Sequence, residues 1–281
     1  MFGDTWRFTA ICGDLLRLLS EVIPYKPFYP TPAFFPFMKD KMLIDAEGYK
    51  YLFKGNDLHT KDGFISKDAI IKAKAGAKLK TNKDVELTLL DAAFLDKYWK
   101  IQRNAQIIPL KDLGFIAAEI GLANDWTIVE AGAGSGGATV FFAHLCSHGQ
   151  LYTYEIRDDY IKIVQGNLTF LGLKNVTLKK QSIYDGIEEK NVDLVLLDLP
   201  EPWLAVDHAL AVLVFGGYLV SYSPCIPQVM DFVDKVRNTP GFLYLKTAVI
   251  GETEWDVVGR KVRPKSQSIG HSGFLTFVRK I

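Results

Sequence analysis

A glycine-rich turn is the first feature of the sequence that could bind a ligand. Residues 131–137 read Ala-Gly-Ala-Gly-Ser-Gly-Gly and follow an apolar run that ends in Glu130. Glycines at a strand-to-helix turn permit positive φ and let the backbone approach a nucleotide-like cofactor closely. Gly132, Gly134 and Gly137 also satisfy the pattern G-x-G-x-x-G, so a nicotinamide dehydrogenase and a plain flexible turn are open alternatives here.

Two acids, Glu130 and Glu155, lie at the ends of predicted strands, where they could contact a cofactor bound at this turn. Glu155 ends the next predicted strand, where a carboxylate can accept hydrogen bonds from ribose hydroxyls in either cofactor class. Glu130, directly before the glycines, resembles the acid in the first motif of class I methyltransferases, in which a sulfonium amino acid lies over the loop instead of a pyrophosphate. Glu130 therefore favours S-adenosylmethionine over a dinucleotide, whereas Glu155 fits both.

The strongest catalytic candidate is Asp198. Residues 192–197 are apolar except for Asp193 and predict a buried parallel strand, which leads into Asp-Leu-Pro-Glu-Pro-Trp at 198–203. The carboxyl ends of such strands carry the chemistry of open α/β sheets. Pro200 and Pro202 fix φ and stiffen the segment, so Asp198 would face the cleft with little freedom. A helix cap is the alternative role, and the two prolines disfavour it.

Alternating strands and helices are expected to position these residues. From about residue 101 the pattern predicts an α/β fold of the Rossmann-like class I type, with a mixed seven-stranded sheet. The predicted strands are 127–130, 151–155, 176–179, 192–197, 218–222, 243–249 and 274–279. The predicted helices are 111–121, 138–146, 160–171, 204–214 and 227–236.

Two further regions precede this catalytic domain of residues 101–281. Residues 42–100 predict a small β domain, because runs rich in β-branched and aromatic residues, such as 42–45, 49–53 and 64–71, alternate with turn signals. Residues 1–41 interleave prolines with aromatic residues, and we interpret them as an extension of unknown role or as the result of an upstream start codon.

The composition is that of an ordinary globular protein. The 281 residues are 48% hydrophobic and 23% charged, with a formal net charge of +1, and no apolar run predicts a membrane segment. Cys12, Cys146 and Cys225 form no C-x-x-C pair, so a disulfide framework is not indicated and a cytoplasmic location fits. His144, Cys146 and His148 lack a further ligand nearby, so no metal site is expected.

Several motifs, taken in order, resemble the tRNA (adenine-N1)-methyltransferase family that acts at T-loop position 58, with 57 as a second target in archaeal members. They are the glycine loop, Tyr154-Glu155, Asp-Leu-Pro-Glu-Pro-Trp at 198–203, Arg263-Pro264 and Gly-His-Ser-Gly-Phe-Leu at 270–275. The resemblance covers about 42–281, and it implies S-adenosyl-L-methionine as cofactor, tRNA as substrate and a homotetramer.

The resemblance also implies roles for individual residues. It places the reaction at Asp198, with Tyr222 near the target base. Cofactor contacts are expected at Gln106, Glu130, Gly132, Gly134, Ser135, Gly136, Gly137, Glu155, Ile156, Gln181, Ser182 and Asp198. RNA contacts are expected at Arg260, Arg263, Lys265 and His271, because residues 258–281 contain six basic residues and no acid.

The chemistry explains why a carboxylate belongs at position 198. Adenine N1 already has an in-plane lone pair, so methyl transfer needs alignment more than a strong base. The purine becomes cationic as the methyl arrives, and a carboxylate that accepts a hydrogen bond from the N6 amino group would favour that charge.

The sequence departs from the family's motifs at two positions, and two alternative functions are considered beside the predicted one. The family usually has an aromatic residue or histidine before Pro-Lys-Asp, whereas this chain has Pro109-Leu110-Lys111-Asp112, and the position after the third strand is Gln181 where an acid is common. The alternatives are another class I methyltransferase and a non-catalytic RNA-binding subunit. The intact glycine loop, Glu155 and Asp198 disfavour the second.

Overall fold

The computed structural model describes residues 40–266 and 270–281. The described residues from Lys41 to Ile281 belong to one compact unit. The extension predicted at 1–41 lies almost wholly outside the described residues. Within the part that the structure describes, no helix is both long and apolar enough to cross a membrane.

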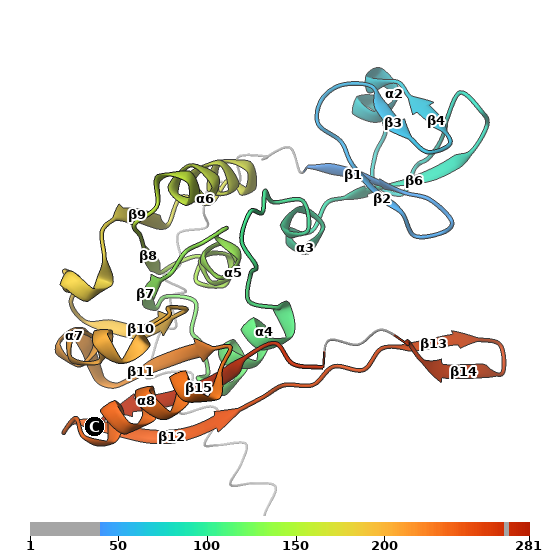
Figure 1. The fold of residues 1–281 in the computed structure, drawn as a ribbon. Helices are drawn as coiled ribbons and strands as arrows, with labels where there is room; N and C mark the ends of the chain where they lie inside the picture. The colour runs from blue at the N-terminus through green and yellow to red at the C-terminus, as the bar shows by residue number, and fades with distance from the viewer. Residues whose placement is uncertain (1–39, 267–269) are drawn as a thin grey trace, which may run out of the picture. The chain divides into compact units, whose positions relative to one another are not determined.

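A small β region begins the compact unit (Figure 1). Its antiparallel sheet has the order β2-β1-β6-β5. Its elements are β1 (Lys41–Ile44), β2 (Lys50–Leu52), β3 (Leu58–Thr60), β4 (Gly63–Ile65), α2 (Lys67–Lys72), β5 (Lys78–Lys80) and β6 (Glu86–Asp91). Leu43, Ile70 and Leu89 are fully buried in its core.

The prediction of a strand-like run at 64–71 was wrong beyond Ile65. The chain turns at Ser66, whose hydroxyl accepts a hydrogen bond from the backbone N–H of Ala69 at 3.4 Å and caps α2. At the other end of α2, the Lys41 ammonium donates to the carbonyls of Ile70, Ile71 and Ala73. Capping at both ends thus stabilises a helix where the β-branched residues alone favoured a strand.

The second sheet confirms the predicted class I architecture, with seven strands in the order β12-β15-β11-β10-β7-β8-β9. The five strands from β11 to β9 pair in parallel, and β15 is antiparallel to both of its neighbours. The strands are β7 (Thr127–Ala131), β8 (Gln150–Glu155), β9 (Val176–Lys180), β10 (Val192–Leu197), β11 (Leu213–Ser223), β12 (Phe242–Ala248) and β15 (Phe274–Lys280).

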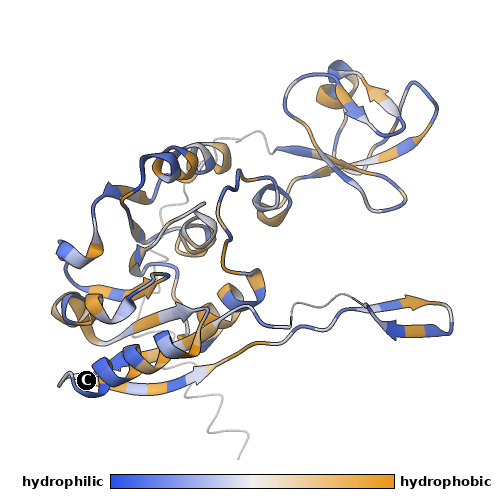
Figure 2. Ribbon diagram, viewed as in Figure 1, coloured by the Kyte–Doolittle hydropathy of each residue, from blue (hydrophilic) through white to orange (hydrophobic). Residues whose placement is uncertain are grey.

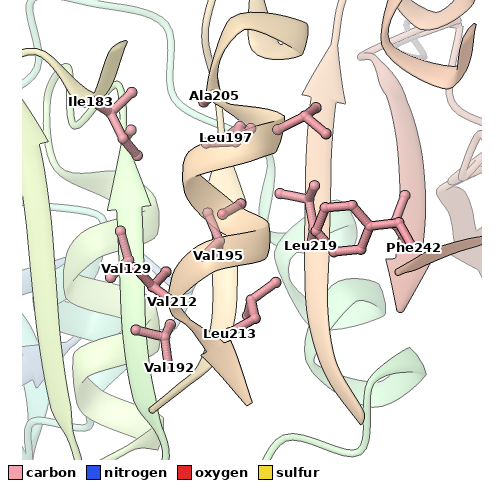
Figure 3. Packing of buried hydrophobic residues seen from close by; sticks show 14 of the residues in the cluster. Val129, Ile183, Val192, Val195, Leu197, Ala205, Val212, Leu213, Leu219 and Phe242 are labelled. Carbon is pink, nitrogen blue, oxygen red and sulfur yellow. The ribbon is translucent and has the colours of Figure 1, made fainter. Parts of the chain in front are cut away.

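Helices cover both faces of this sheet. They are α4 (Leu110–Glu119), α5 (Gly137–Leu145), α6 (Asp158–Leu171), η1 (Ile183–Asp185), η2 (Pro202–Ala205), α7 (Val206–Val212) and α8 (Ile226–Arg237), while α3 (Phe94–Tyr98) packs on α5 and α6. Val195 and Leu197 of β10 pack toward α7 and α8 (Figure 3), whereas Leu194 and Leu196 pack with α4 and α5. Hydrophilic residues interrupt the hydrophobic ones along α6 and α8 (Figure 2), as expected of helices with one face toward solvent.

One predicted boundary was wrong in this region. The helix expected at 204–214 ends at Val212, and the strand expected at 218–222 already begins at Leu213. Leu213 pairs with Val192 of β10, and a register irregularity follows near Gly216, which has a φ of +80°. The apolar residues of this stretch fit either element, and pairing with β10 decides for the strand.

A second hairpin, β13 (Trp255–Val258) with β14 (Lys261–Pro264), lies between β12 and β15 and was not predicted. We call this hairpin, with residues 249–254 and the described part of 265–273, the arm. We call its two described flanking segments the legs: residues 249–254, which follow β12, and residues 270–273, which precede β15 (Figure 1). One face of the hairpin is apolar. It consists of two cross-strand pairs, Trp255 with Pro264 and Val257 with Val262.

Candidate active site

A cavity of about 310 Å³ lies at the carboxyl ends of β7, β8 and β10, which are neighbours in the sheet. Each of these strands contributes one carboxylate to the wall: Glu130, Glu155 and Asp198. The rest of the lining is Ala105, Gln106, Ile107, Ile108, Gly132, Ala133, Gly134, Gly137, Ala138, Ile156, Arg157, Tyr160, Leu199 and Pro200.

Gly132 joins the glycine loop to the loop after β10. Its φ is +86°, and a Cβ added there would lie 2.0 Å from the backbone oxygen of Asp198. The Asp198 N–H in turn donates to the Ala131 carbonyl at 3.0 Å. Only glycine allows this close approach. The glycine loop that was predicted to bind a ligand therefore also fixes the position of the Asp198 backbone.

Two further residues of the glycine loop support the cavity wall from behind. Ser135 Oγ accepts hydrogen bonds from the backbone N–H groups of Asn104 and Ala105, at 3.0 and 2.8 Å. Gly136, with a φ of +80°, precedes α5, and a Cβ there would come within 3.2 Å of Val164 of α6. These two predicted cofactor residues therefore lie behind the lining, where they hold the loop against residues 104–105 and α6.

Asn167 on α6 fixes the same segment from the other side. Its side-chain nitrogen donates to the carbonyls of Gln102 and Ser135, both at 3.0 Å, and its oxygen accepts from the Gln102 N–H at 2.8 Å. Asn167 is buried, and its bond to the Ser135 carbonyl forms away from solvent, whereas its two bonds to Gln102 are partly buried. This network was missed by the sequence prediction because its partners are 32 and 65 residues apart in the chain.

Glu155 is held by backbone amides on two sides. Its Oε2 accepts from the Gly134 N–H at 3.0 Å, and its Oε1 accepts from the N–H groups of Ile156 and Arg157 at 2.8 and 2.9 Å. A carboxylate has about four acceptor sites, so capacity for a ligand hydroxyl is left. The arrangement preorganises an acceptor at the wall, which suits a ribose diol.

Glu130 and Asp198 share a poorly solvated region. Glu130 is buried and accepts a hydrogen bond from Thr139 Oγ1 at 2.6 Å, and burial raises its pKa. Burial, followed by the charge of Glu130, raises the pKa of Asp198 to about 7. A cationic ligand in the cavity would favour the ionised form of both carboxyls, because an opposite charge nearby favours ionisation.

These features fit S-adenosylmethionine, whose sulfonium and amino groups are cationic. Three carboxylates and one guanidinium, that of Arg157, line the cavity. Arg157 lies over the Tyr160 ring, with the guanidinium carbon 4.1 Å from the ring centroid, and ion-pairs with Asp159. The excess of carboxylates in the lining therefore favours a cationic ligand with hydroxyl groups over a pyrophosphate. Arg157 and Tyr160 were not predicted, although their place just after Glu155 was a usable signal.

The loop that carries Asp198 is held at its far end as well. Gln228 Nε2 on α8 donates to the Pro200 carbonyl at 2.9 Å. The Glu201 N–H donates to the Tyr184 hydroxyl at 3.3 Å. Trp203 is half-buried in η2 and is not part of the cavity wall. The two prolines are thus supplemented by contacts to α8 and η1.

Tyr222 lies beside this loop rather than in the cavity wall. Its β11 neighbour Ser221 pairs with Leu197, the residue before Asp198. The Tyr222 hydroxyl donates to the Ser272 carbonyl at 2.6 Å, and a Cβ on Gly273 would lie 2.4 Å from the tyrosine ring. Burial, with the charges of Asp112 and Asp198, raises the pKa of Tyr222 to about 12.

Three other predicted residues lie outside the cavity wall. Ser182 Oγ accepts from the Tyr184 N–H at 3.2 Å and caps η1, and Gln181 directly precedes it. His271 is exposed, and its Nε2 is 3.2 Å from the Pro224 carbonyl oxygen, in the loop after β11.

The predicted RNA-binding residues Arg260, Arg263 and Lys265 lie on the arm and are exposed. Lys265 forms an ion pair with Glu254, and Arg263 is opposite Asp256 in the hairpin register. The basic character of this segment is therefore partly compensated by Asp256 of β13 and by Glu254 just before it, which the prediction from residues 258–281 did not include.

His144, Cys146 and His148 have separate partners. The His144 ring stacks on Phe94 with centroids 3.9 Å apart, and Cys146 Sγ lies 3.3 Å from the Ala123 carbonyl. His148 Nδ1 is 3.1 Å from Asn124 Nδ2. Among the described residues, no group of three potential ligands is arranged to hold a metal ion.

Comparisons with known proteins agree with this geometry. Residues 97–263 match the family model described as tRNA methyltransferase complex GCD14 subunit. The chain is 32% identical to the tRNA (adenine(57)-N(1)/adenine(58)-N(1))-methyltransferase TrmI of Methanocaldococcus jannaschii, over 85% of this chain and 94% of that one. It is 29% identical to the tRNA (adenine(58)-N(1))-methyltransferase TrmI of Thermus thermophilus, over 85% and 96%. A SAM-dependent O-methyltransferase from Thermotoga maritima superposes with a TM-score of 0.76 at 27% identity, over 86% and 93%.

Proposed function

Because the chain belongs to the tRNA methyltransferase family of the GCD14 subunit, we propose that it transfers a methyl group from S-adenosylmethionine to N1 of an adenosine in the T loop of tRNA. The observation that carries the proposal is the set of three carboxylates, Glu130, Glu155 and Asp198, at the ends of three adjacent strands around one cavity. The cofactor supplies an electrophilic methyl group on a sulfonium.

Each carboxylate has a separate task in this proposal. Glu155, fixed by three backbone amides, accepts hydrogen bonds from the ribose hydroxyls. Glu130, beneath the glycine loop, faces the cationic amino acid part of the cofactor. Gln106 and Ile156, which lie at the rim, exclude water from the nucleoside.

Asp198 orients the target base. Its carboxylate accepts a hydrogen bond from the N6 amino group and stabilises the charge that the purine gains as N1 is methylated. A pKa near 7 leaves a substantial fraction ionised at neutral pH. Tyr222, beside Asp198, supports the base from the adjacent strand.

The target is position 58, with position 57 as a second candidate. The Methanocaldococcus relative is named for both positions and the Thermus relative for 58 alone. The identities of 32% and 29% are too similar to choose between these two specificities. Mapping the methylated position in the product decides whether 57 is also a target.

Contacts with the tRNA backbone come from the arm and from His271. Arg260, Arg263 and Lys265 present exposed cations at the hairpin, and His271 lies next to the loop that follows Tyr222. A base in a folded T loop must be unstacked before N1 is accessible, and wide backbone contacts would offset that cost of a few kcal/mol.

A homotetramer in the cytoplasm completes the proposal. The apolar face of the hairpin supports assembly: Trp255, Val257 and Val262 are 56%, 66% and 55% exposed. A two-stranded hairpin is marginally stable alone, so this face requires a cover. A second copy provides the same apolar surface in return.

The test is methyl transfer from labelled S-adenosylmethionine to an unmodified tRNA transcript by wild type and by Asp198→Asn. We expect transfer by wild type and a loss of about 100-fold or more in kcat, measured at saturating S-adenosylmethionine, in the variant, as for an interaction made in the transition state. Full activity of Asp198→Asn would remove the carboxylate from the mechanism. Transfer to small-molecule hydroxyls but not to tRNA would favour the O-methyltransferase activity named for the Thermotoga structure.

A further inference from the structure

Lys111 binds both legs of the arm. Its ammonium group donates to the Ile250 carbonyl at 2.7 Å and to Ser272 Oγ at 2.6 Å. Ile250 lies two residues after β12, and Ser272 lies two residues before β15. The third bond of the ammonium goes to Asp112 Oδ1 at 2.8 Å. An ammonium group has three donors, so this lysine is fully satisfied.

Asp112 and Ser272 close the network. The Ser272 hydroxyl accepts from Lys111 and donates to Asp112 Oδ2 at 2.7 Å. The Asp112 side chain is completely buried, and that of Lys111 is 10% exposed. A buried ion pair costs desolvation that its attraction only partly offsets, so the pair is weak evidence for a role in stability alone.

The same serine residue connects the network to Tyr222. The tyrosine hydroxyl donates to the backbone carbonyl of Ser272 at 2.6 Å, while the Ser272 side chain binds Lys111 and Asp112. Gly273, the next residue, packs so closely on the Tyr222 ring that a Cβ there would lie 2.4 Å away. A shift of this leg would therefore move the tyrosine.

We propose that Lys111 is a positioning residue which, with Asp112 and Ser272, holds the arm in a fixed position relative to Tyr222. RNA bound by the arm would then keep a fixed position relative to Tyr222 and to Asp198 beside it. The part that concerns RNA rests on the proposed function. Lys111 and Asp112 do not line the cofactor cavity, so their effect on turnover would be transmitted through Ser272 and Tyr222.

The chain offers a matched control for loss of a lysine. Lys41 also donates to three acceptors, the carbonyls of Ile70, Ile71 and Ala73, but in the small β region. Lys41→Met should lower the melting temperature without altering the arm or the turnover. Lys111→Met should alter both the arm and the turnover, because two of its three acceptors are in the arm.

Hydrogen exchange tests the tie without any substrate. In Lys111→Met, exchange in peptides covering 250–254 and 270–273 should accelerate about tenfold or more, as expected when local opening becomes easier. Lys41→Met should leave these peptides unchanged. If the arm exchanges equally in wild type and Lys111→Met, the tie is refuted, whether or not the protein acts on tRNA.

Kinetics test the link to Tyr222. We expect Lys111→Met to lower kcat on tRNA about tenfold with S-adenosylmethionine affinity within about twofold of wild type. In a Tyr222→Phe background the same substitution should cost less than about twofold, because the two residues act through one path. If the two substitutions lower kcat independently, so that their effects multiply in the double variant, the proposal is overturned. Full activity of Tyr222→Phe would overturn it as well.

A milder pair guards against misfolding of Lys111→Met. Ser272→Ala removes only the hydroxyl of a half-buried residue, and Ser272→Thr retains it. Loss of kcat in the first and recovery in the second supports the network, whereas equal activity of the two refutes it. Absence of methyl transfer to tRNA by wild type would instead reject the proposed function, and hydrogen exchange would still decide the tie.

Discussion

The backbone carbonyl of Asp198 lies where a side chain at Gly132 would have to be, 2.0 Å from an ideal Cβ. The glycine loop and the acidic loop are therefore in direct backbone contact, and the geometry of one sets the geometry of the other. With a φ of +86°, Gly132 is also in a region that L residues rarely adopt.

Gly132→Ala should consequently impair cofactor binding and turnover together, and lower the melting temperature, because the backbone clash cannot be relieved by a side-chain movement. Gly166→Ala in α6 is the matched control, since Gly166 has nothing within 4 Å of its added Cβ. There alanine should stabilise the helix by about 1 kcal/mol. Calorimetric titration with S-adenosylmethionine and thermal melts measure both effects, and normal affinity in Gly132→Ala would contradict the contact.

The affinity for S-adenosylmethionine should rise with pH. Asp198 has a pKa of about 7, so it is mostly neutral at pH 6 and mostly ionised at pH 8. A cationic ligand prefers the ionised form, and the affinity should rise about tenfold across this interval. Asp198→Asn should flatten the curve, and S-adenosylhomocysteine, which lacks the sulfonium charge, should show a shallower one. Equal slopes for wild type and Asp198→Asn would assign the titration to another group.

The same pKa predicts how stability depends on pH. The native protein keeps the Asp198 proton up to about pH 7, because its pKa is raised to about 7, whereas the unfolded chain releases it near the ordinary pKa of 3.8. The contribution of this carboxyl to stability therefore falls as pH rises from about 4 to 7. Asp198→Asn should melt at a higher temperature than wild type at pH 8, with a smaller difference at pH 5. A lower melting temperature at pH 8 would show that the charge is stabilised by contacts other than those described.

Glu155→Gln should weaken binding of the cofactor before it affects chemistry. The amide keeps the size of the side chain but replaces one acceptor oxygen with a donor, so a loop N–H or a ribose hydroxyl loses its partner. A loss of about 10-fold to 100-fold in affinity corresponds to one or two such bonds. Glu86→Gln, at an exposed ion pair with Lys78, serves as the control. Unchanged affinity in Glu155→Gln would remove this residue from the ribose site.

Arg260→Ala combined with Arg263→Ala should weaken tRNA binding at low salt and leave S-adenosylmethionine binding intact. Each lost phosphate contact should reduce the slope of log affinity against log salt by about 0.7 to 0.9. Arg237→Ala is the control, since Arg237 lies over the Tyr244 ring near the end of α8. An unchanged salt slope in the double variant would exclude the arm from RNA binding.

The strand ends of the site could be predicted from the sequence, because hydrophobic runs mark β7, β8 and β10 and their last residues meet at one edge of a parallel sheet. The position of Glu130, Glu155 and Asp198 around one cavity follows from that rule. The contacts of Lys111 with Ile250 and Ser272 could not be predicted, since they join residues 139 and 161 positions apart and no periodic pattern records them.

The unpredicted elements have the same physical origin. The arm hairpin contains short strands with charged residues between apolar ones, a pattern that also suits a loop. The helix α2 depends on a cap at Ser66 and on the distant Lys41. Tertiary contacts decide these local choices, which the intrinsic preferences of the residues leave open.

The most direct test of the central claim is to identify the nucleotide that receives the methyl group. Purified protein would be incubated with labelled S-adenosylmethionine and an unmodified tRNA transcript, followed by nuclease digestion and mass spectrometry. The account predicts N1-methyladenosine at position 58 of the T loop, with any second product at 57. Label on another base, or cofactor binding without transfer to any tRNA, would contradict it.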